Sequence, residues 1–455
     1  MPTDLYPLPF HKLLRWMISE LRKNGSIFGI PRALFYEPKD EPFATEIFGE
    51  FLATPIGPSA GPHTQLSQNI VSAWLCGGRF IELKTVQILD DLEIPRPCID
   101  AADEGYNVEW SQELRLHQSA QEYINAWALI HVLRKALSWD GKPLGTIFNM
   151  SVGYNLEGIK SPKIQEFLRK LTDATEALGE IREILAQEFP EYADVEIPPR
   201  ISTSVTLSTM HGCPPHEIEA IAEFLLSRGF HTFVKLNPTL LGQDRVMRIL
   251  HDHLGFREIR IPDEVFEHDL QYEDAVPLIQ RLREKARALG LTFGVKLTNT
   301  LAMANHRGVL PGGEIYMSGR ALYPVTLNLF WRLFSDLDGD IHVSYSGGAD
   351  ALNLPTLISC GALPVTACTD LLKPGGYARF GQWLSELREA MAKAGAKNLE
   401  EFTKNRAENL KKAAEESLKN PRYKKAFFLG ELPKIPDGLS FFDCIAAPCV
   451  AACPA

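Results

Sequence analysis

Eight short apolar segments, separated by longer amphipathic stretches, constrain the fold of this chain more than any other feature of its sequence. They are rich in Val, Ile, Phe and Thr, which is typical of strands buried on both faces of a parallel sheet. The alternation predicts an α/β fold, a (β/α)8 TIM barrel with a helical lead-in before it and a helical extension after it. A doubly wound open sheet stays open as the alternative. The expected strands are residues 51–57, 79–85, 145–151, 202–208, 231–237, 292–298, 340–346 and 363–369.

Composition and charge narrow the class of protein. The chain has 455 residues, a formal net charge of −10 and 45% hydrophobic residues, which is typical of a soluble globular protein with a large core. The acidic balance argues against nucleic acid or an anionic membrane as a partner. The start of the chain lacks the apolar segment of a signal peptide, and no apolar run reaches the ~18 residues of a membrane helix. The eight cysteines do not suggest a disulfide framework, so we expect a cytoplasmic protein.

The C-terminal ends of the expected strands carry small, hydroxylated and basic residues. Barrel enzymes place their functional groups at these ends, and a Gly-Gly turn after the seventh strand, beside the loop after the eighth, is typical of a phosphate site. Lysines that point into a barrel mouth are costly unless an anion or an electron-rich ring lies beside them. The strand-end segments are PIGPSAGP at 55–62, Lys84-Thr85, Lys235 to Pro238, Lys296 to Thr300, Ser346 to Asp350 and Cys368-Thr369.

Several of these segments resemble the FMN-binding barrel of the dihydroorotate and dihydropyrimidine dehydrogenases, over roughly residues 47–393. The shared motifs are ATPIGPSAGP, FIELKTV, GYNVEWSQEL, VTLSTMHG, FVKLNPT, KLTNT, MSGRALYP and SYSGGAD, in the order of that family. The resemblance implies that the barrel binds FMN and exchanges a hydride with a small planar or carbonyl substrate.

The same resemblance assigns roles to individual residues. Lys235 is expected at the N1/O2 side of the isoalloxazine and Asn149 at its polar edge. Four residues are expected along the flavin, namely Ala60, Gly61, Lys84 and Thr85. Four more are expected to hold its phosphate, namely Gly347, Gly348, Cys368 and Thr369. The expected substrate-binding residues, whose amide, carboxylate and hydroxyl groups suit the edge of a small ring, are Asn107, Glu109, Asn299 and Thr300.

The stretch SVTLSTMHGCPPHEIEAI at residues 204–221 departs from the family pattern. The family reads Asn-Leu-Ser-Cys-Pro-His-Gly and uses the cysteine to protonate the substrate. An ungapped alignment puts Thr209 at that place, and the cysteine of this chain, Cys213, comes four residues later. Both are candidate catalytic proton donors, and the helix start after Cys213 is expected to favour its thiolate. A hydrolase that uses Cys213 as nucleophile with His211 or His216 is an alternative.

The last twelve residues contain Cys444, Cys449 and Cys453, followed by Pro454. Closely spaced cysteines with a proline after the last are typical of iron–sulfur ligands, although a zinc site or spare thiols stay possible. The pattern resembles the iron–sulfur domain of dihydropyrimidine dehydrogenase and the glutamate synthase small subunit, with Phe441 at the first cysteine of the family. We expect [4Fe–4S] clusters whose remaining ligands come from a longer chain or a partner.

A barrel placed before such cysteines resembles the family assigned as selenate reductase subunits, over essentially the whole chain. The expected regions are a lead-in at 1–46, the FMN-type barrel at 47–393, a helical linker at 394–436 and the start of an incomplete iron–sulfur domain at 437–455. The implied function is an oxidoreductase module in which iron–sulfur clusters relay electrons to or from the barrel. NAD(P) and FAD would bind only to further domains or subunits. The rival interpretation is a barrel without catalysis that serves as a scaffold for partner subunits.

Overall fold

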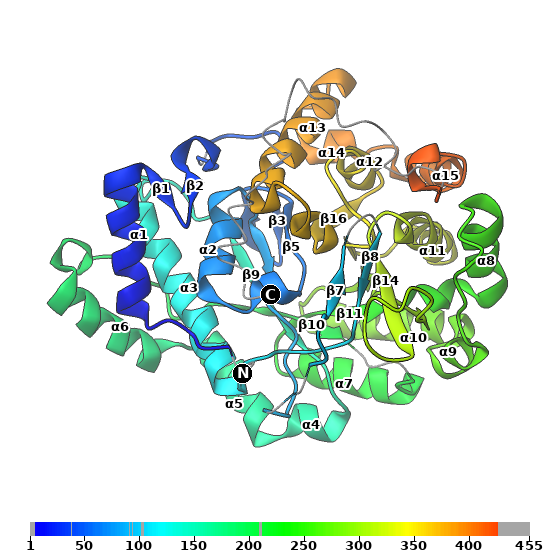
Figure 1. Ribbon diagram of the computed structural model, residues 1–455, viewed down its shortest axis with the longest axis horizontal. Helices are drawn as coiled ribbons and strands as arrows, with labels where there is room; N and C mark the ends of the chain where they lie inside the picture. The colour runs from blue at the N-terminus through cyan, green and yellow to red at the C-terminus, as the bar shows by residue number, and fades with distance from the viewer. Residues whose placement is uncertain are drawn as a thin grey trace.

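The computed structural model describes residues 5–37, 39–90, 92, 94–101, 104–208 and 212–425. Its centre is an eight-stranded parallel sheet, and the backbone N–H of Arg79 donates to the carbonyl of Ile56 (2.8 Å) to join the two edge strands. The sheet therefore curves into a nearly closed barrel (Figure 1), and the prediction of a (β/α)8 barrel is confirmed. In the order of their pairing, the strands are β5 (Ile56–Pro58), β16 (Ala362–Ala367), β15 (Val343–Tyr345), β12 (Phe293–Leu297), β11 (His231–Leu236), β10 (Ser204–Ser208), β9 (Ile147–Val152) and β6 (Phe80–Glu82).

One glycine permits the closure of the barrel. A Cβ on Gly57 of β5 would lie only 1.8 Å from the carbonyl oxygen of Phe80 in β6. No side chain fits in that space, so the first and last strands of the pairing order approach each other only with glycine at this position.

Helices follow the barrel strands and surround them (Figure 1). The segment between β9 and β10 contributes three helices, and the segment between β11 and β12 contributes another three. In chain order, the helices of the barrel are α2 (Ser67–Leu75), α3 (Leu116–Ala136), α4 (Leu156–Lys160), α5 (Pro162–Thr172), α6 (Thr175–Glu188), α7 (Pro215–Ser227), α8 (Gln243–Met247), α9 (Asp263–His268), α10 (Tyr272–Ala288), α11 (Leu322–Asp336), α12 (Leu354–Ser359) and α13 (Arg379–Ala394).

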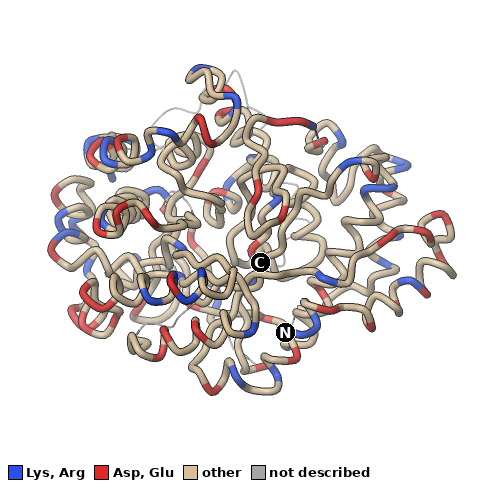
Figure 2. Tube along the Cα trace, turned by 180° about the vertical axis from the view of Figure 1, so that it is seen from behind, with Lys and Arg blue, Asp and Glu red and all other residues tan. Residues whose placement is uncertain are grey.

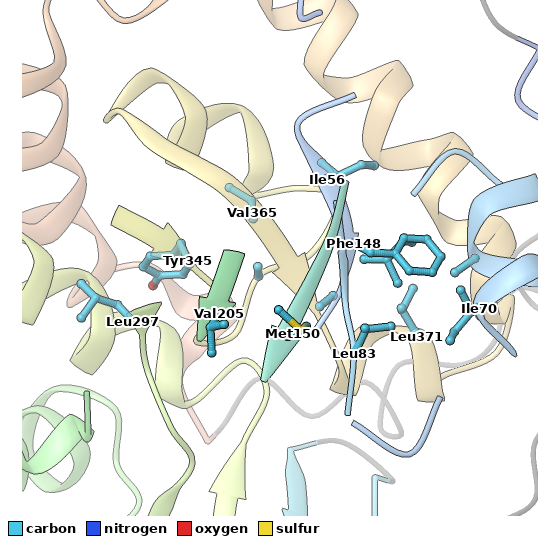
Figure 3. Close-up of a cluster of buried hydrophobic side chains, with 14 of the residues drawn as sticks. Ile56, Ile70, Leu83, Phe148, Met150, Val205, Leu297, Tyr345, Val365 and Leu371 are labelled. Carbon is cyan, nitrogen blue, oxygen red and sulfur yellow. The ribbon is translucent and has the colours of Figure 1, made fainter. Parts of the chain in front are cut away.

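Side chains alternate between the lumen of the barrel and the layer under the helices. Lys296 of β12 points into the lumen, because it contacts Glu82, Ser344 and Thr366 from three other strands. Its neighbours along β12 therefore point outward. Figure 3 shows the outward-facing set, with Ile70 of α2 and Leu371 beside it. The apolar core thus lies between strands and helices, whereas the lumen carries polar groups. The strand residues labelled in Figure 3 are Ile56, Leu83, Phe148, Met150, Val205, Leu297, Tyr345 and Val365.

Two small hairpins and a helix precede the barrel. Helix α1 (Phe10–Asn24) lies against α3 and α6, and β1 (Ser26–Ile27) pairs with β2 (Ile30–Pro31). The second hairpin, β3 (Thr45–Ile47) and β4 (Glu50–Leu52), covers the N-terminal end of the barrel, where Phe48 stacks on His231 at 4.8 Å between ring centroids. The expected first strand at 51–57 is therefore corrected. Its first residues belong to this hairpin, and only Ile56 and Gly57 belong to the barrel.

A four-stranded antiparallel sheet, which we call the roof sheet, lies over the C-terminal mouth of the barrel. It is made of two insertions, one after β6 and one after β12, and the sequence patterns did not predict it. Because both insertions follow barrel strands, they leave the barrel at the same end. The strands, in pairing order, are β13 (Leu301–Ala304), β14 (Glu314–Ser318), β8 (Gly105–Asn107) and β7 (Ile99–Asp100).

The chain after α13 continues along the outside of the barrel. Helices α14 (Leu399–Phe402) and α15 (Arg406–Ser417) pack on barrel helices, with α15 against α11 and α12. Figure 2 shows Lys and Arg interspersed with Asp and Glu along the outer helices. Among the described residues, no helix is both long and apolar enough to cross a bilayer.

Candidate functional site

A cavity of about 600 Å³ opens between the barrel mouth and the roof sheet. All eight barrel strands contribute to it, β11 through Lys235, its last residue but one, and the others through their last residue or the loop that follows. The size lies within the usual range of ~300–1,000 Å³ for small-molecule sites. The structure therefore brings together residues that are far apart in sequence. Those named in the sequence analysis that line this cavity are Ala60, Gly61, Lys84, Thr85, Asn107, Glu109, Lys235, Asn299, Thr300, Gly347, Gly348, Cys368 and Thr369.

Two lysines face the cavity, of which Lys84 is buried and Lys235 partly buried. Lys84 donates to the carbonyl of Trp110 (2.9 Å), and its ammonium lies 4.7 Å from the centre of the Trp110 ring. Burial lowers the pKa of Lys84 to about 8. Burial also lowers the pKa of Lys235, although the negative charges of Glu82 and Glu109 act in the opposite direction. Two ammonium groups in one enclosed space favour an anionic or electron-rich ligand.

A charged network lies in the lumen beneath the cavity. Lys296 forms an ion pair with Glu82 and donates to the hydroxyls of Ser344 (3.2 Å) and Thr366 (2.5 Å). Glu82 in turn accepts from the backbone N–H of Ala60 (3.2 Å), so the network holds the loop that forms one wall of the cavity. Burial lowers the pKa of Lys296 to about 8. The sequence analysis did not assign a role to this pair.

The loops after β15 and β16, the seventh and eighth barrel strands, form one end of the cavity. A Cβ on Gly347 would lie 2.2 Å from Thr326 Oγ1, and one on Gly348 would lie 2.5 Å from the carbonyl oxygen of Gly319. Gly348 also has a φ of +71°, which disfavours other residues. Glycine at both positions lets this loop pack closely on its neighbours while it lines the cavity. The location matches the phosphate site of TIM barrels.

The roof sheet brings polar side chains to the opposite wall. Asn107 ends β8, and Glu109 accepts a hydrogen bond from Tyr316 of β14 (3.0 Å). Asn299 follows β12 and donates to Asn237 Oδ1 (2.7 Å), while Thr300 lines the cavity directly before β13. The four expected substrate-binding residues thus share one cavity, although they come from different insertions.

Asn149 is placed differently from the expectation. It is fully buried in the lumen on β9 and does not line the cavity. Its side-chain amide donates to Thr206 Oγ1 (3.0 Å) and to the carbonyl of Met150 (2.9 Å). In this structure it braces β9 against β10 beneath the cavity.

Cys213 lines a separate, small cavity together with Asn237 and Asp269. Lys235 borders both cavities, so the thiol lies beside the larger site and not within it. Burial, and secondly the charge of Glu217, raise the pKa of the Cys213 thiol to about 11. Burial therefore acts against the thiolate that the helix start is expected to favour.

The raised pKa also weakens the cysteine-hydrolase alternative, since thiolate is the nucleophilic form. His216 is exposed on the first turn of α7, whereas Thr209 and His211 lie outside the described residues. The three terminal cysteines, Cys444, Cys449 and Cys453, also lie outside them. Within the described ranges, no group of three or more His, Cys, Asp or Glu side chains is placed to hold a metal ion.

Several cavity residues had no place among the sequence candidates. Trp110 directly follows Glu109, and Arg320 lies two residues after β14. Tyr316 of β14 reaches the cavity wall only through its hydrogen bond to Glu109. The sequence gives little indication that these residues belong to a site, because they lie in loops and short strands. Tertiary packing decides where such segments lie over the barrel mouth. The inward orientation of Glu82 could have been predicted from the sequence. Side chains alternate along a strand, so Glu82 and Lys84 point to the same side.

Comparison with known proteins gives matches over nearly the whole chain. Two curated proteins from Escherichia coli, strains K12 and O157:H7, are both named YgfK and described as candidate oxidoreductases. Each is 45% identical to this chain over 473 aligned residues. The match covers 100% of this chain and 45% of each relative, so the chain spans less than half of their length.

The fold is also similar to a solved structure, the ligand-free DHODH from Eimeria tenella. The TM-score is 0.51 at 16% sequence identity, and the match covers 86% of this chain and 97% of that one. At this identity the similarity concerns the fold.

The model of one protein family covers most of the chain. It is described as the N-terminal TIM-barrel domain of the oxidoreductase YgfK, and it matches residues 28–425. This range includes the barrel, the roof sheet and the described C-terminal helices. The chain therefore belongs to the YgfK oxidoreductase family, whose N-terminal TIM-barrel domain it contains.

Proposed function

We propose that the barrel binds FMN in the cavity at its mouth and works as the flavin module of an oxidoreductase. The observation that carries the proposal is that two lysines, the buried Lys84 and the partly buried Lys235, line one cavity together with the glycine loop at 347–348. When bound, FMN supplies hydride transfer. The two lysines would contribute positive charge, and the glycine loop would bind the anionic phosphate group.

The residues present fit such a cofactor. Ala60 and Gly61 are small, so a flat ring can lie against their backbone, and a Cβ on Gly61 would meet Cys368 Sγ at 2.8 Å. The Gly347–Gly348 loop and Thr369 form the end at which a phosphate would bind. Lys235 rises from the lumen beside Glu82, where its ammonium can stabilise negative charge on a reduced ring.

We further propose that the polar wall formed by the roof sheet binds a small planar or carbonyl substrate. Asn107 and Asn299 offer amide donors and acceptors, and Glu109 offers an acceptor for an N–H group. Thr209 and Cys213 are the proposed proton donors. Its raised pKa of about 11 keeps the Cys213 thiol protonated at neutral pH, so it holds a proton to donate and is a poor nucleophile.

The terminal cysteines support an electron relay as part of the same proposal. Their spacing is typical of iron–sulfur ligands, and the last described residues reach the barrel mouth, where Arg320 of the cavity wall binds the carbonyl of Lys424 (2.8 Å). We propose that [4Fe–4S] clusters exchange electrons with the barrel, and that NAD(P) and FAD bind to further domains or subunits. The resemblance to selenate reductase subunits suggests such a multi-domain enzyme.

A titration of flavin-free protein with FMN, followed by flavin fluorescence, tests the cofactor assignment. We expect saturable binding, and a dissociation constant raised about tenfold or more in Lys235→Met, which keeps the volume of the side chain but removes its charge. Lys285→Met on the outer face of α10 is the matched control, because that lysine pairs with Glu223 at the surface. Absence of binding, or equal effects of both substitutions, would count against the proposal.

A further inference from the structure

Two aspartates line the end of the cavity that is formed by the loops after β15 and β16. Asp370 is neutralised by Arg379 through two hydrogen bonds of 2.8 and 2.9 Å. Asp350 forms its ion pair with Arg422. A carboxylate beside a phosphate site repels the ligand unless a cation compensates its charge. Both carboxylates at this end have such a cation.

The two arginines differ in origin. Arg379 begins α13, the last helix of the barrel, whereas Arg422 belongs to residues 421–425, which we call the C-terminal strap. Hydrogen bonds and an ion pair hold the strap against the rest of the protein. Arg320 donates to the carbonyls of Arg422 (3.0 Å) and Lys424 (2.8 Å), and Lys425 donates its backbone N–H to Leu254 (2.9 Å) and pairs with Glu258.

The groups that hold the strap are themselves parts of the cavity wall. Arg320 lines the cavity, is 6% exposed and pairs with Glu104 (3.0 Å). Tyr423 stacks on Tyr323, with ring centroids 4.6 Å apart. The backbone nitrogen of Tyr323 lies 2.9 Å from the position that a Cβ on Gly348 would take. The strap thus touches the phosphate end through Asp350, Arg320 and Tyr323.

We propose that the C-terminal strap is a working part of the phosphate end of the cavity, and that Arg422 is a positioning residue that neutralises Asp350. The inference rests on the proposed binding of FMN. It adds a coupling between the strap and the ligand. The same contacts hold the strap and shape the phosphate end, so the docked strap favours phosphate binding. A bound phosphate favours the docked strap to the same extent. Residues 421–425, where the described chain ends, are then held at the barrel mouth when the cofactor is bound.

The coupling is tested by the affinities of the 455-residue chain for FMN and for riboflavin, which lacks the phosphate. In Arg422→Ala, we expect the dissociation constant for FMN to rise about tenfold or more, and that for riboflavin to change less than about twofold. Arg422→Ala combined with Asp350→Asn removes both charges, and should recover most of the affinity for FMN. Arg422→Lys keeps the charge and should retain the preference for FMN even if Arg422→Ala folds poorly.

Lys412→Ala is the matched control, because it removes an exposed ion pair with Glu416 on α15, outside both the strap and the cavity, and should leave the affinities for both flavins unchanged. Equal losses for both flavins in Arg422→Ala, or no recovery in the double variant, would overturn the proposed role of the strap. A wild-type chain that binds neither flavin would instead overturn the proposed function, and the inference with it.

Discussion

Lys296 and Glu82 form an ion pair across the lumen of the barrel, between the sixth and the second barrel strand in chain order. They are 1% and 3% exposed, and water therefore screens neither charge. The pair also positions the cavity wall, because Glu82 accepts from the backbone of Ala60. The lumen under the ligand site is therefore polar. The largely apolar strand sequences do not predict this.

Removal of one partner of this pair should destabilise the protein strongly. In Lys296→Met, the carboxylate of Glu82 is left buried and unpaired, and we expect the free energy of unfolding to fall by about 3–5 kcal/mol. The combination with Glu82→Gln removes the uncompensated charge and should recover much of this loss. Urea unfolding measures both variants. A double variant as unstable as the single one would show that the charge pair is not the cause.

Lys84 predicts a pH dependence of stability. Its pKa in the folded chain is about 8, below the ordinary value of 10.5, because burial disfavours the charged form. Between these two pH values the unfolded chain binds more protons than the folded one, so this lysine makes the free energy of unfolding rise with pH. Below pH ~8 the lysine is charged in both states and adds no slope.

The comparison of the wild type with Lys84→Met isolates this contribution. The free energy of unfolding of the wild type minus that of the variant should increase from pH 8 to pH 10.5, and urea unfolding at several pH values measures it. The difference removes the titration of tyrosines and other groups common to both proteins. A difference that is flat or falls with pH would contradict the burial of a lowered-pKa lysine at this position.

Cys213 should react slowly with alkylating reagents at neutral pH. Since its pKa is raised to about 11, only a small fraction is thiolate near pH 7, and the labelling rate should increase with pH up to about 11. Mass spectrometry of peptides after brief treatment with iodoacetamide measures the rate. The buried Cys360, with a pKa raised to about 12, serves as the internal reference. Rapid, pH-independent labelling of Cys213 at neutral pH would contradict its desolvated environment.

The barrel was predictable because its signal is repeated and local. Strands such as β11 and β12 are short and rich in Phe, Val and Leu, and amphipathic helical segments lie between the strands, so the element type follows from periodicity. The first strand was placed too early, because Phe51 and Leu52 have the same apolar character as Ile56 but pair with Thr45 and Glu46 in a hairpin. The local pattern of apolar residues does not show whether a segment pairs with a hairpin strand or with a barrel strand.

The site was predictable only in part. The strand-end residues Lys84, Lys235 and Gly347 meet in one cavity because the closure of a barrel brings all C-terminal strand ends together. The roof sheet and the C-terminal strap were not predictable, since their short strands and Arg422 gain their positions from contacts far away in the sequence. The pKa of Cys213 also depends on burial, which the adjacent helix start does not reveal.

The most direct test of the central claim is the identity of the flavin that the protein contains. The chain is purified without oxygen, supplied with FMN and FAD in equal amounts, freed of unbound flavin and denatured, and the released flavin is identified by mass and quantified by absorbance. The account predicts FMN in an amount equal to that of the chain, with little FAD. Release of FAD alone, or of no flavin from a folded protein, would contradict it.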